Sequence, residues 1–454
     1  MSSQAQTTSH NSHNSNDSQQ SIGQVDLQGG KTKTINPASV GSTPLKKQLV
    51  IYLISHFCGL GIGASAPALL YIRNYLAMDT SNPDFWARFA LVGGPSLMSA
   101  IFAIPFGFML KKISRVKSLI FGISVMGLSG IACLVAPNIY SFVVARMLFG
   151  IGETAVLVSS MVLINLYFVD DMTKGKILGG QSGLIMFGSM AYTVLNTAFV
   201  LIDWRIVCAL PMLALMCIPL VQKYLKEPKR VADDPDDMCE KQRRKESIAA
   251  KVAFNPIEDD YGLLSFCMLM GFVLMLTDSV VISVTPFVIE SKSQYPNFAP
   301  MLIVVMSLAN AATAMIYKRI LRISSGNTNI IGFTICAIGS FFMYSEPVKY
   351  NEIWLVFAYA MFGVGMGILF PNIATYLLHL CSKNRASIMI SMMTTAIFAG
   401  GFIAPYFVEL CIMFMPLDRV CNYLDTIILC STGIMSFILH KLYERECRLY
   451  MKTF

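Results

Sequence analysis

The sequence has little charge. Of its 454 residues only 14% are Asp, Glu, Lys or Arg, whereas 55% are hydrophobic, and the mean hydropathy is +0.58. Soluble domains carry about a quarter charged residues, so this chain has too few charges to cover the surface of one to three globular domains in water. The shortage excludes a soluble enzyme and indicates a protein of the lipid bilayer.

The sequence also lacks common signatures of enzymes and metal centres. It contains no H-E-x-x-H, no G-x-S-x-G and no C-x-x-C, which are patterns of zinc proteases, serine hydrolases and redox or metal-binding cysteine pairs. Most of the 12 cysteines fall in apolar runs, where Cys behaves as a small hydrophobic residue. We therefore expect no enzyme, no metal site and no cofactor.

Long apolar runs, by contrast, are abundant. A helix that crosses a bilayer needs roughly 20 predominantly apolar residues, and twelve such windows occur. They lie at about 49–70, 89–110, 118–136, 139–163, 177–200, 205–222, 262–286, 298–317, 329–345, 353–378, 387–410 and 422–443. The sequence thus predicts an all-α polytopic membrane protein with twelve transmembrane helices.

The Lys and Arg residues predict its orientation, because cytoplasmic loops carry an excess of them. With a cytoplasmic N-terminus, 28 of the 35 lie in inner segments and 6 in outer loops, and Arg146 lies inside a span. Both termini are therefore expected in the cytoplasm. The net charge of +8 reflects this topology and predicts no nucleic-acid partner. The basic loops suit a bacterial inner, a plasma or an organellar membrane equally well.

Two polar segments divide the chain. Residues 1–45 are rich in Ser, Asn, Gln and Thr and have too few apolar side chains to fold, so we expect a disordered cytoplasmic tail. Residues 223–260 contain an acidic and a basic run, which indicate a hydrated cytoplasmic linker. The linker separates an N-terminal six-helix bundle at 46–222 from a C-terminal one at 261–443, and residues 444–454 form a cytoplasmic C-terminus.

The two predicted halves resemble each other. The motif F-G-I-G stands at 149–152 in the fourth span, and F-G-V-G stands at 362–365 in the tenth, at the same rank in its half. Basic loops follow both the second and the eighth span. This correspondence predicts an internal repeat. Its helix-packing glycines are Gly150, Gly152, Gly363 and Gly365.

The fourth span carries the strongest resemblance to a known family. Its residues R-M-L-F-G-I-G at 146–152 resemble the pattern R-x-x-x-G-x-G in the fourth helix of the major facilitator superfamily of secondary transporters. The chain after residue 45 resembles that superfamily throughout, which implies two six-helix bundles around a central cavity. The subfamily stays open. The segments are similar to small-organic, drug or siderophore exporters, and Gly-Ile-Gly-Glu at 150–153 is similar to spinster-type members.

The loop after the second span partly matches the superfamily's G-x-x-x-D-R-x-G-R-R/K signature. Gly107, Lys112 and Arg115 fit it, whereas Lys111 replaces the acid and Ser114 replaces the glycine. The resemblance implies that Gly107, Lys112 and Arg115 belong to an inter-half gating loop without its acidic latch. Span five also lacks the proline of the family's antiporter pattern, which weakens an antiport assignment.

Ionisable residues inside spans indicate a functional or structural role, because each costs roughly 2.5–3.5 kcal/mol at the bilayer centre. Arg146 and Glu153 are seven residues apart, so they share one helix face but lie about 10 Å apart along it, too far for a direct pair. The resemblance places this face on the central cavity. Asp278 in the seventh span is the corresponding carboxyl of the second half. We expect these three residues to couple transport to protons, with an interhelical polar clamp as the alternative.

Other polar residues in spans are candidate substrate contacts, although buried amides more often bond to neighbouring helices, and His56 also suits a structural clamp. These candidates are His56, Gln181, Asn196, Asn310 and Asn372.

These features predict a secondary active transporter of a small organic solute that works by alternating access. We expect it to be coupled to protons and monomeric, with the solute, protons and the bilayer as its partners. A lipid or lysolipid transporter, or an uncoupled facilitator, on the same fold is the alternative. The sequence leaves open the substrate, the direction of transport and the choice among symport, antiport and uniport.

Overall fold

The computed structural model describes residues 45–76, 82–110, 112–167, 171–225, 227, 261–292, 298–324, 327–343, 352–380, 386–420 and 425–451. Every regular element within these ranges is a helix. The predicted tail, apart from Leu45, and most of the predicted linker lie outside them.

The first half of the chain forms six rods, several of which are built from consecutive helical segments. They are α1 (Leu45–Ser55), η2 (His56–Gly59) and α2 (Leu60–Leu76); α3 (Pro83–Arg88), η3 (Phe89–Gly93) and α4 (Gly94–Met109); α5 (Arg115–Leu134); α6 (Ile139–Tyr167); α7 (Asp171–Phe199); and α8 (Trp204–Ala209), η4 (Leu210–Cys217) and α9 (Ile218–Tyr224).

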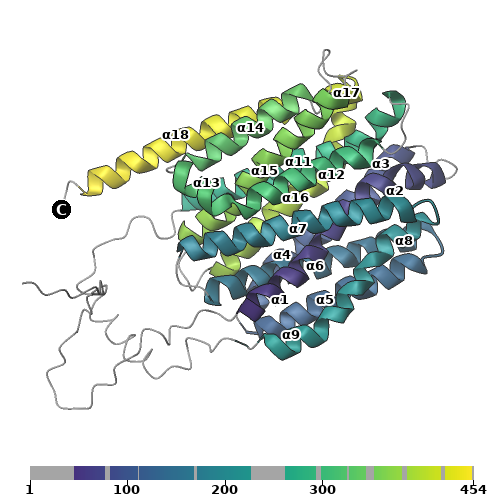
Figure 1. Ribbon diagram of the computed structural model, residues 1–454, viewed down its shortest axis with the longest axis horizontal. Helices are drawn as coiled ribbons and strands as arrows, with labels where there is room; N and C mark the ends of the chain where they lie inside the picture. The colour runs from purple at the N-terminus through teal and green to yellow at the C-terminus, as the bar shows by residue number, and fades with distance from the viewer. Residues whose placement is uncertain are drawn as a thin grey trace, which may run out of the picture. The chain divides into compact units, whose positions relative to one another are not determined.

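The second half repeats this pattern (Figure 1). Its elements are α11 (Tyr261–Lys292), α12 (Phe298–Met315), α13 (Tyr317–Ser324), α14 (Thr328–Phe342), α15 (Glu352–Leu380), α16 (Ala386–Ile412), α17 (Leu417–Arg419) and α18 (Thr426–Met451).

The helical rods match the predicted spans one for one. In the described part of the chain, eight helices are long and apolar enough to cross a bilayer, and two shorter apolar helices lie at Thr328–Phe342 and Thr426–Ile438. The rod from α1 to α2 and the 29-residue α7 supply the other two. The predicted fold class, twelve membrane helices in two six-helix halves, is confirmed.

Side chains of the connecting segments start several of these helices. Ser114 precedes α5, and its hydroxyl accepts a hydrogen bond from the backbone N–H of Lys117 at 3.3 Å. Asp203 does the same for α8, where the N–H of Arg205 lies 2.8 Å from the carboxylate. Such side chains satisfy N–H groups that have no partner within the helix.

The repeat is visible in how its glycines pack. A Cβ on Gly150 would lie 2.8 Å from the carbonyl carbon of Pro95 in α4, and one on Gly363 would lie 3.0 Å from that of Met306 in α12. The glycines of the fourth and tenth spans thus face the second and eighth spans respectively, so the repeat extends to the three-dimensional contacts.

The second glycine of each motif faces the next helix of its own half. A Cβ on Gly152 would lie 2.6 Å from the amide nitrogen of Met126 in α5, and one on Gly365 would lie 2.7 Å from that of Cys336 in α14. Both helix pairs approach so closely that only glycine fits, as is common where membrane helices cross.

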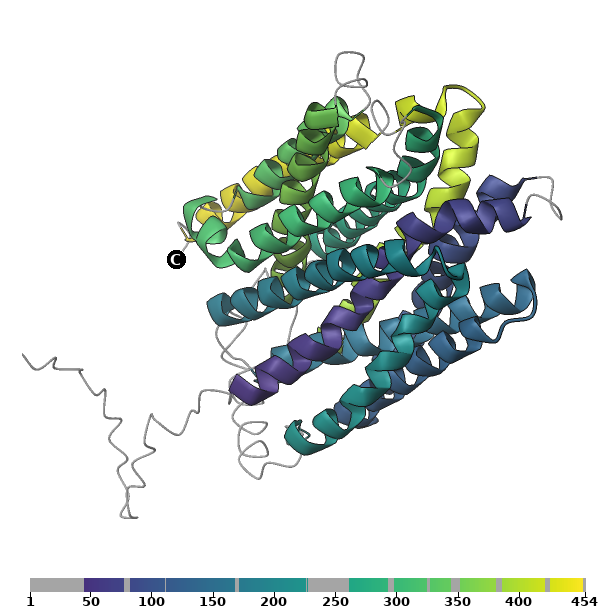
Figure 2. The same ribbon diagram turned by 45° about the vertical axis from the view of Figure 1, so that its right-hand side comes forward.

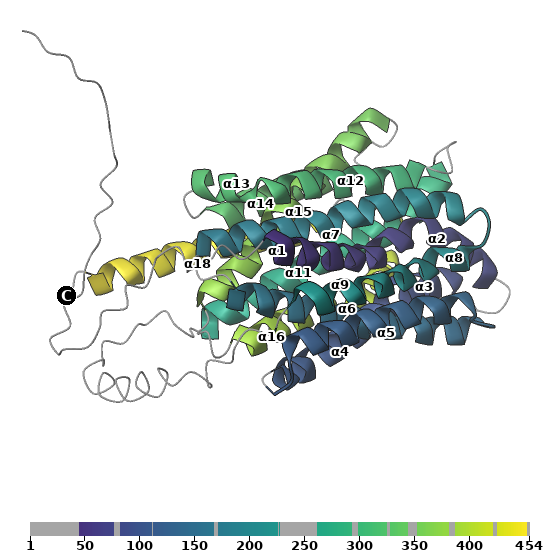
Figure 3. The same cartoon turned by 60° about the horizontal axis from the view of Figure 1, so that its bottom comes forward.

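Two long seams join the halves. In the first, α4 packs against α16, and the Thr395 hydroxyl donates to the carbonyl of Ala100 at 3.1 Å. In the second, α7 packs against α12, and the hydroxyls of Ser189 and Ser307 lie 3.5 Å apart. Figure 3 shows α12, α14 and α15 on one side of the bundle and α4 and α5 on the other.

The glycines of span five belong to the second seam. A Cβ on Gly179 would lie 2.8 Å from the carbonyl oxygen of Ala314, and one on Gly183 would lie 3.1 Å from that of Ala311. The rod from α1 to α2, drawn in purple, packs on the same helix α7 (Figure 2). The glycine-rich sequence of this span thus allows backbone-to-backbone contact between the halves.

Candidate functional site

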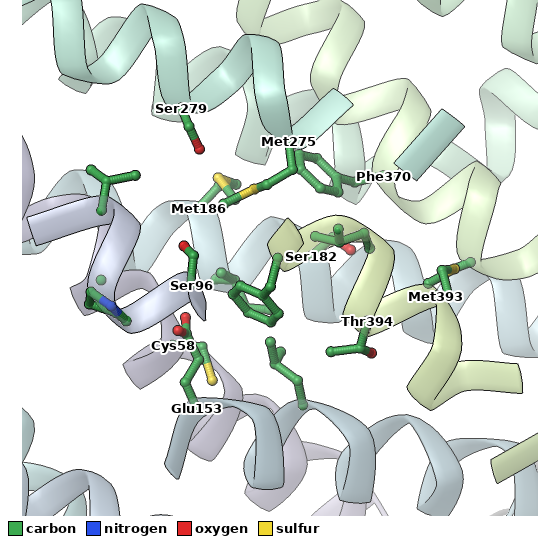
Figure 4. A pocket seen from close by; sticks show the side chains of 18 of the residues that line it. Cys58, Ser96, Glu153, Ser182, Met186, Met275, Ser279, Phe370, Met393 and Thr394 are labelled. Atoms are coloured by element: carbon green, nitrogen blue, oxygen red, sulfur yellow. The ribbon is translucent and has the colours of Figure 1, made fainter. Parts of the chain in front are cut away.

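A cavity lies where the two halves meet. Its walls come from η2, α2, η3, α4, α6 and α7 of the first half and from α11, α15 and α16 of the second. Its lining is mostly apolar with a few polar groups, which is the usual composition of a small-molecule site. The cavity is therefore the candidate substrate site (Figure 4).

Arg146 of α6 lines this cavity and is 1% exposed. Its Nη2 donates to the carbonyl oxygen of Leu91 at 3.1 Å, and the guanidinium carbon lies 4.9 Å from the centre of the Phe149 ring. Its Nε has no hydrogen-bond partner among the described residues. The side chain is thus held on one edge and keeps a buried donor available.

Glu153, two turns further along α6, lines the same cavity and is 9% exposed. Cys58 of η2 and Ser96 of α4 lie beside it (Figure 4). No ion pair joins Glu153 to Arg146 within the described residues, as the spacing of seven predicts. The structure therefore brings the two predicted residues to one cavity as separate charges.

The second half contributes an apolar wall. Met275 of α11, Phe370 of α15 and Met393 of α16 line the cavity, and Figure 4 shows Met275 and Phe370 across from Glu153. The polar side chains on this wall are the hydroxyls of Ser279 and Thr394. The two halves thus differ in chemistry, since the charged groups of the lining come from the first half.

Gln181 of α7 also lines the cavity, and its amide is held in place from two sides. Its Nε2 donates to the hydroxyl of Ser55 at 2.9 Å and to that of Ser160 at 2.8 Å. This predicted contact residue therefore reaches the site while tying α7 to α1 and α6.

Asp278 lies outside the cavity lining. It is 3% exposed, and its neighbours Met275 and Ser279 line the cavity, whereas Asp278 itself does not. Its carboxyl interacts electrostatically with Cys336 of α14, inside the second half. The structure therefore does not bring Asp278 together with Arg146 and Glu153.

The remaining predicted contact residues lie outside the cavity lining. His56 Nε2 lies 2.8 Å from the hydroxyl of Tyr192, and its Nδ1 lies against the carbonyl of Leu53. Asn372 accepts from the hydroxyl of Tyr317 at 2.7 Å and donates to Asn329 at 2.6 Å. These contacts match the structural alternative, a polar clamp between helices.

Two further amides also lie away from the lining. Asn196 of α7 is fully buried. Asn310 of α12 is 3% exposed, and its backbone carbonyl faces Gly367 of α15. Neither residue lines the central cavity.

The predicted gating loop divides into two kinds of contact. Gly107 faces the second half, because the Ser387 hydroxyl donates to its carbonyl at 3.4 Å. Arg115 pairs instead with Glu227, just after α9, with 3.3 Å between Nη1 and Oε1. Lys112 is exposed.

Glu227 binds the start of α5 through several donors. The Ser114 hydroxyl donates to it at 2.7 Å, and the backbone N–H groups of Arg115 and Val116 donate at 3.0 Å. Burial alone would raise the pKa of Glu227, but these hydrogen bonds hold the pKa below its ordinary value. The sequence pattern misses this contact because Glu227 is 112 residues from Arg115.

Charged contacts between the halves were also missed from the sequence. Arg88 directly precedes the predicted second span, and its side chain is 1% exposed and forms an ion pair with Glu409 of α16. Arg73 of α2 pairs with Glu290 of α11 at 2.6 Å. The acids were recognisable in the sequence, since Glu290 ends an apolar run and Glu409 interrupts one, but nothing local identifies their partners.

Asp425 is a further buried acid. It lies within the predicted twelfth span but is not among the predicted site residues. It is fully buried, and neither carboxyl oxygen has a hydrogen-bond partner among the described residues. Within the same ranges, no three His, Cys, Asp or Glu side chains gather as metal ligands would.

Comparison with known proteins agrees with this architecture. Residues 51–405 match the sequence profile of the Major Facilitator Superfamily. No curated protein sequence matches the chain.

Solved structures share the fold at low sequence identity. The proton:xylose symporter XylE bound to 6-bromo-6-deoxy-D-glucose superposes with a TM-score of 0.66 and 15% identity over 88% of this chain and 95% of that one. The human organic anion transporter MFSD10 (TETRAN) gives 0.63 and 11% over 88% and 99%. A D-xylose-proton symporter gives 0.63 and 16% over 88% and 97%.

The profile covers well over half of the sequence, and the twelve-helix architecture is shared with these transporters. The chain therefore belongs to the Major Facilitator Superfamily and is a multi-pass membrane transporter, not an enzyme.

Proposed function

We propose that this secondary transporter carries a small organic solute through the central cavity by alternating access, and that protonation of Glu153 drives the cycle. The observation that supports this function is the placement of Arg146 and Glu153 in one cavity between the halves. Intramembrane ionisable residues that face a cavity typically mark substrate and proton pathways.

The arrangement of the walls suits alternating access. The cavity is bounded by helices of both halves, so rocking one half against the other exposes the same site first to one side of the membrane and then to the other. The halves meet along the seams α4–α16 and α7–α12, which are the surfaces that such rocking would open and close.

The proposed proton site is Glu153. Among the described residues that line the cavity it is the carboxyl, and gaining a proton removes one negative charge from a buried site. Arg146 on the same helix face would then act as the fixed positive charge of the site, and Gln181 as a polar contact of the solute.

Asp278 takes a different part in this proposal. Its carboxyl is buried inside the second half near Cys336, so its titration would alter the packing within that half rather than touch the solute. An effect of Asp278→Asn on coupling with unchanged solute affinity would support this role.

A lipid or lysolipid transporter is the alternative, and the apolar wall favours an apolar cargo. In the conformation of this structure, the α4–α16 and α7–α12 seams are closed by direct contacts such as Thr395 to Ala100 and Ser189 to Ser307. A lipid that enters sideways needs one of these seams to open. Cross-linking that seals both seams should stop lipid movement but leave solute binding intact.

The function can be tested with purified protein in proteoliposomes. A thermal-shift screen against metabolite panels identifies a ligand, since a molecule that binds only the folded state raises its stability. Uptake of that ligand should follow an imposed proton gradient and should lose this dependence in Glu153→Gln. Glu352→Gln, at the exposed start of α15, is the matched control. Uptake that ignores the gradient in every variant would identify an uncoupled facilitator.

We further propose that the protein works as a monomer with both termini in the cytoplasm and with the linker at 223–260 between the halves. The charge distribution of the loops supports this orientation. Impermeant labelling of a cysteine placed beside Arg115 should then occur only from the cytoplasmic side.

A further inference from the structure

We propose that the cargo is an apolar organic monoanion carried together with one proton, so that the occupied and the empty cavity have the same net charge. This inference rests on the proposed function, and it follows from the charges and the chemistry of the cavity lining.

The lining holds one fixed positive and one titratable negative group. Arg146 and Glu153 both come from α6, and the Cys58 thiol of η2 is the other titratable side chain that faces Glu153. The described linings of α4 and α7 add uncharged polar and apolar side chains, and those of α11, α15 and α16 add apolar side chains and two hydroxyls. Residues 62–66 of α2 contain no ionisable residue.

These groups restrict which cargo moves at low electrostatic cost. The empty cavity is neutral when Arg146 is charged and Glu153 is ionised. With a proton on Glu153 and a monoanion beside Arg146, the sum is again zero. Both forms can therefore cross between inward and outward states without an uncompensated buried charge.

Other cargoes leave the cavity charged. A neutral solute carried with a proton gives a net charge of one positive unit, because Arg146 stays charged while Glu153 is neutralised. Exchange of a cation for a proton gives one positive unit in both half-cycles. An uncompensated buried ion costs several kcal/mol even after relaxation. The charge sum thus favours the anion over the neutral solute and the cation.

Arg146 has the geometry to receive an anion. Its Nη2 is engaged by Leu91, whereas its Nε is buried in the cavity wall without a partner among the described residues. A buried donor without a partner is rare and costly. The planar guanidinium binds carboxylate or sulfonate oxygens well because it donates through several N–H groups.

The cavity wall opposite Arg146 and Glu153 indicates the chemistry of the cargo beyond its charged group. Met275, Met393 and Phe370 line the cavity on the side of the second half, and methionine adapts its shape to irregular apolar ligands. Among the residues that the structure describes, the second half provides no amide or charged side chain to this lining. A sugar would leave hydroxyls without partners there, so the wall suits an apolar body.

The probe for this inference is 2-naphthalenesulfonate, compared with the neutral 2-naphthylmethanol and with a naphthylmethyl-trimethylammonium cation. We expect the sulfonate to raise the melting temperature of the purified full-length protein, and more strongly at acidic than at neutral pH. Neither of the other probes should do so.

Variants of Arg146 and Glu153 distinguish the contributions of these two side chains to binding. Arg146→Gln should weaken sulfonate binding by about tenfold or more, the loss expected for a charge-assisted contact, and Arg146→Lys should retain part of it. Glu153→Gln should bind the sulfonate with its pH dependence removed. Glu352→Gln should behave as the unmodified protein. If Arg146→Gln does not fold, weaker binding in Arg146→Lys provides the same test.

Transport tests the charge balance. Sulfonate uptake into proteoliposomes should be driven by a proton gradient and should be unaffected by a potassium diffusion potential set with valinomycin. A preference for the cation or the neutral probe, or uptake that follows the potential, would overturn the inference. If another solute shows Glu153-dependent uptake while the sulfonate does not bind, the anion inference is wrong and the proposed function stands. If no uptake depends on Glu153, the proposed function itself is wrong.

Discussion

Arg73 of α2 and Glu290 of α11 form a two-pronged ion pair across the two halves, with 2.6 Å from Nη1 to Oε2 and 2.8 Å from Nη2 to Oε1. The Arg73 guanidinium lies 5.7 Å from the centre of the Phe287 ring, and that of Arg88, which pairs with Glu409, lies 5.2 Å from the same ring. Both pairs hold the end of the bundle where α2 ends. A change of access at this end requires both pairs to separate.

Breaking the first pair should make this end open more often. Arg73 and Glu290 are 22% and 41% exposed, and exposed pairs contribute about 0.2–1 kcal/mol. Arg73→Gln should therefore shift the closed-to-open ratio by up to about fivefold. The measurement is the rate at which a thiol reagent, applied from this side, labels Ser279→Cys in a chain with Cys58→Ser.

The charge swap Arg73→Glu/Glu290→Arg serves as its control, because it restores the attraction and should return the labelling rate toward that of the unmodified pair. Equal labelling rates in the protein with the unmodified pair, in Arg73→Gln and in the charge swap would show that this contact does not hold the halves together.

The second pair should matter more for stability, because Arg88 is 1% exposed. Removing one member of a buried pair leaves the other charge uncompensated, whereas replacing both by apolar residues is often tolerated. Glu409→Gln should lower the melting temperature more than Glu290→Gln does. The double variant Arg88→Met/Glu409→Met should recover most of that loss, and strictly additive losses would contradict the idea.

Much of the fold could be predicted from the sequence, because a membrane helix needs about 20 apolar residues and that requirement is local. The sharing of one cavity by Arg146 and Glu153 was also predictable, since a spacing of seven puts two residues on one helix face. The position of Asp278 outside the cavity was not predictable, because the face of α11 that lines the cavity depends on how α11 packs against α15 and α16.

The contacts between the halves could not be predicted. Arg88 and Glu409 are 321 residues apart, and Arg73 and Glu290 are 217 apart. Pairing over such distances leaves no periodicity or motif in the sequence. The sequence places Arg88 just outside the second span, in agreement with the predicted topology. It does not reveal that the Arg88 side chain is buried against the second half.

The Glu227 contact should make stability depend on pH. Its pKa is held below the ordinary value in the folded protein, so the stabilisation is present in full above the unfolded pKa of about 4.3. The stabilisation is lost as the pH falls through the folded value. The melting temperature of Glu227→Gln should be lower than that of the unmodified protein near neutral pH. The difference between the two melting temperatures should become smaller below about pH 4. A constant difference across this range would contradict the assignment.

The glycine motifs of the repeat should be intolerant of even one methyl group. A Cβ on Gly363 would lie 3.0 Å from the carbonyl carbon of Met306 and nearer still to its oxygen, and a backbone carbonyl cannot turn aside as a side chain can. We expect Gly363→Ala and the corresponding Gly150→Ala to lower stability by about 1–3 kcal/mol, the usual cost of overpacking.

Gly175 of α7 provides a matched control, because a Cβ there would meet its nearest neighbour, Thr375, at 3.6 Å, an ordinary contact. Since alanine is favoured over glycine by about 1 kcal/mol inside a helix, Gly175→Ala should leave the melting temperature unchanged or raise it. Equal losses for Gly175→Ala and Gly363→Ala in detergent would mean that the close approach of α15 to α12 is not what requires glycine at position 363.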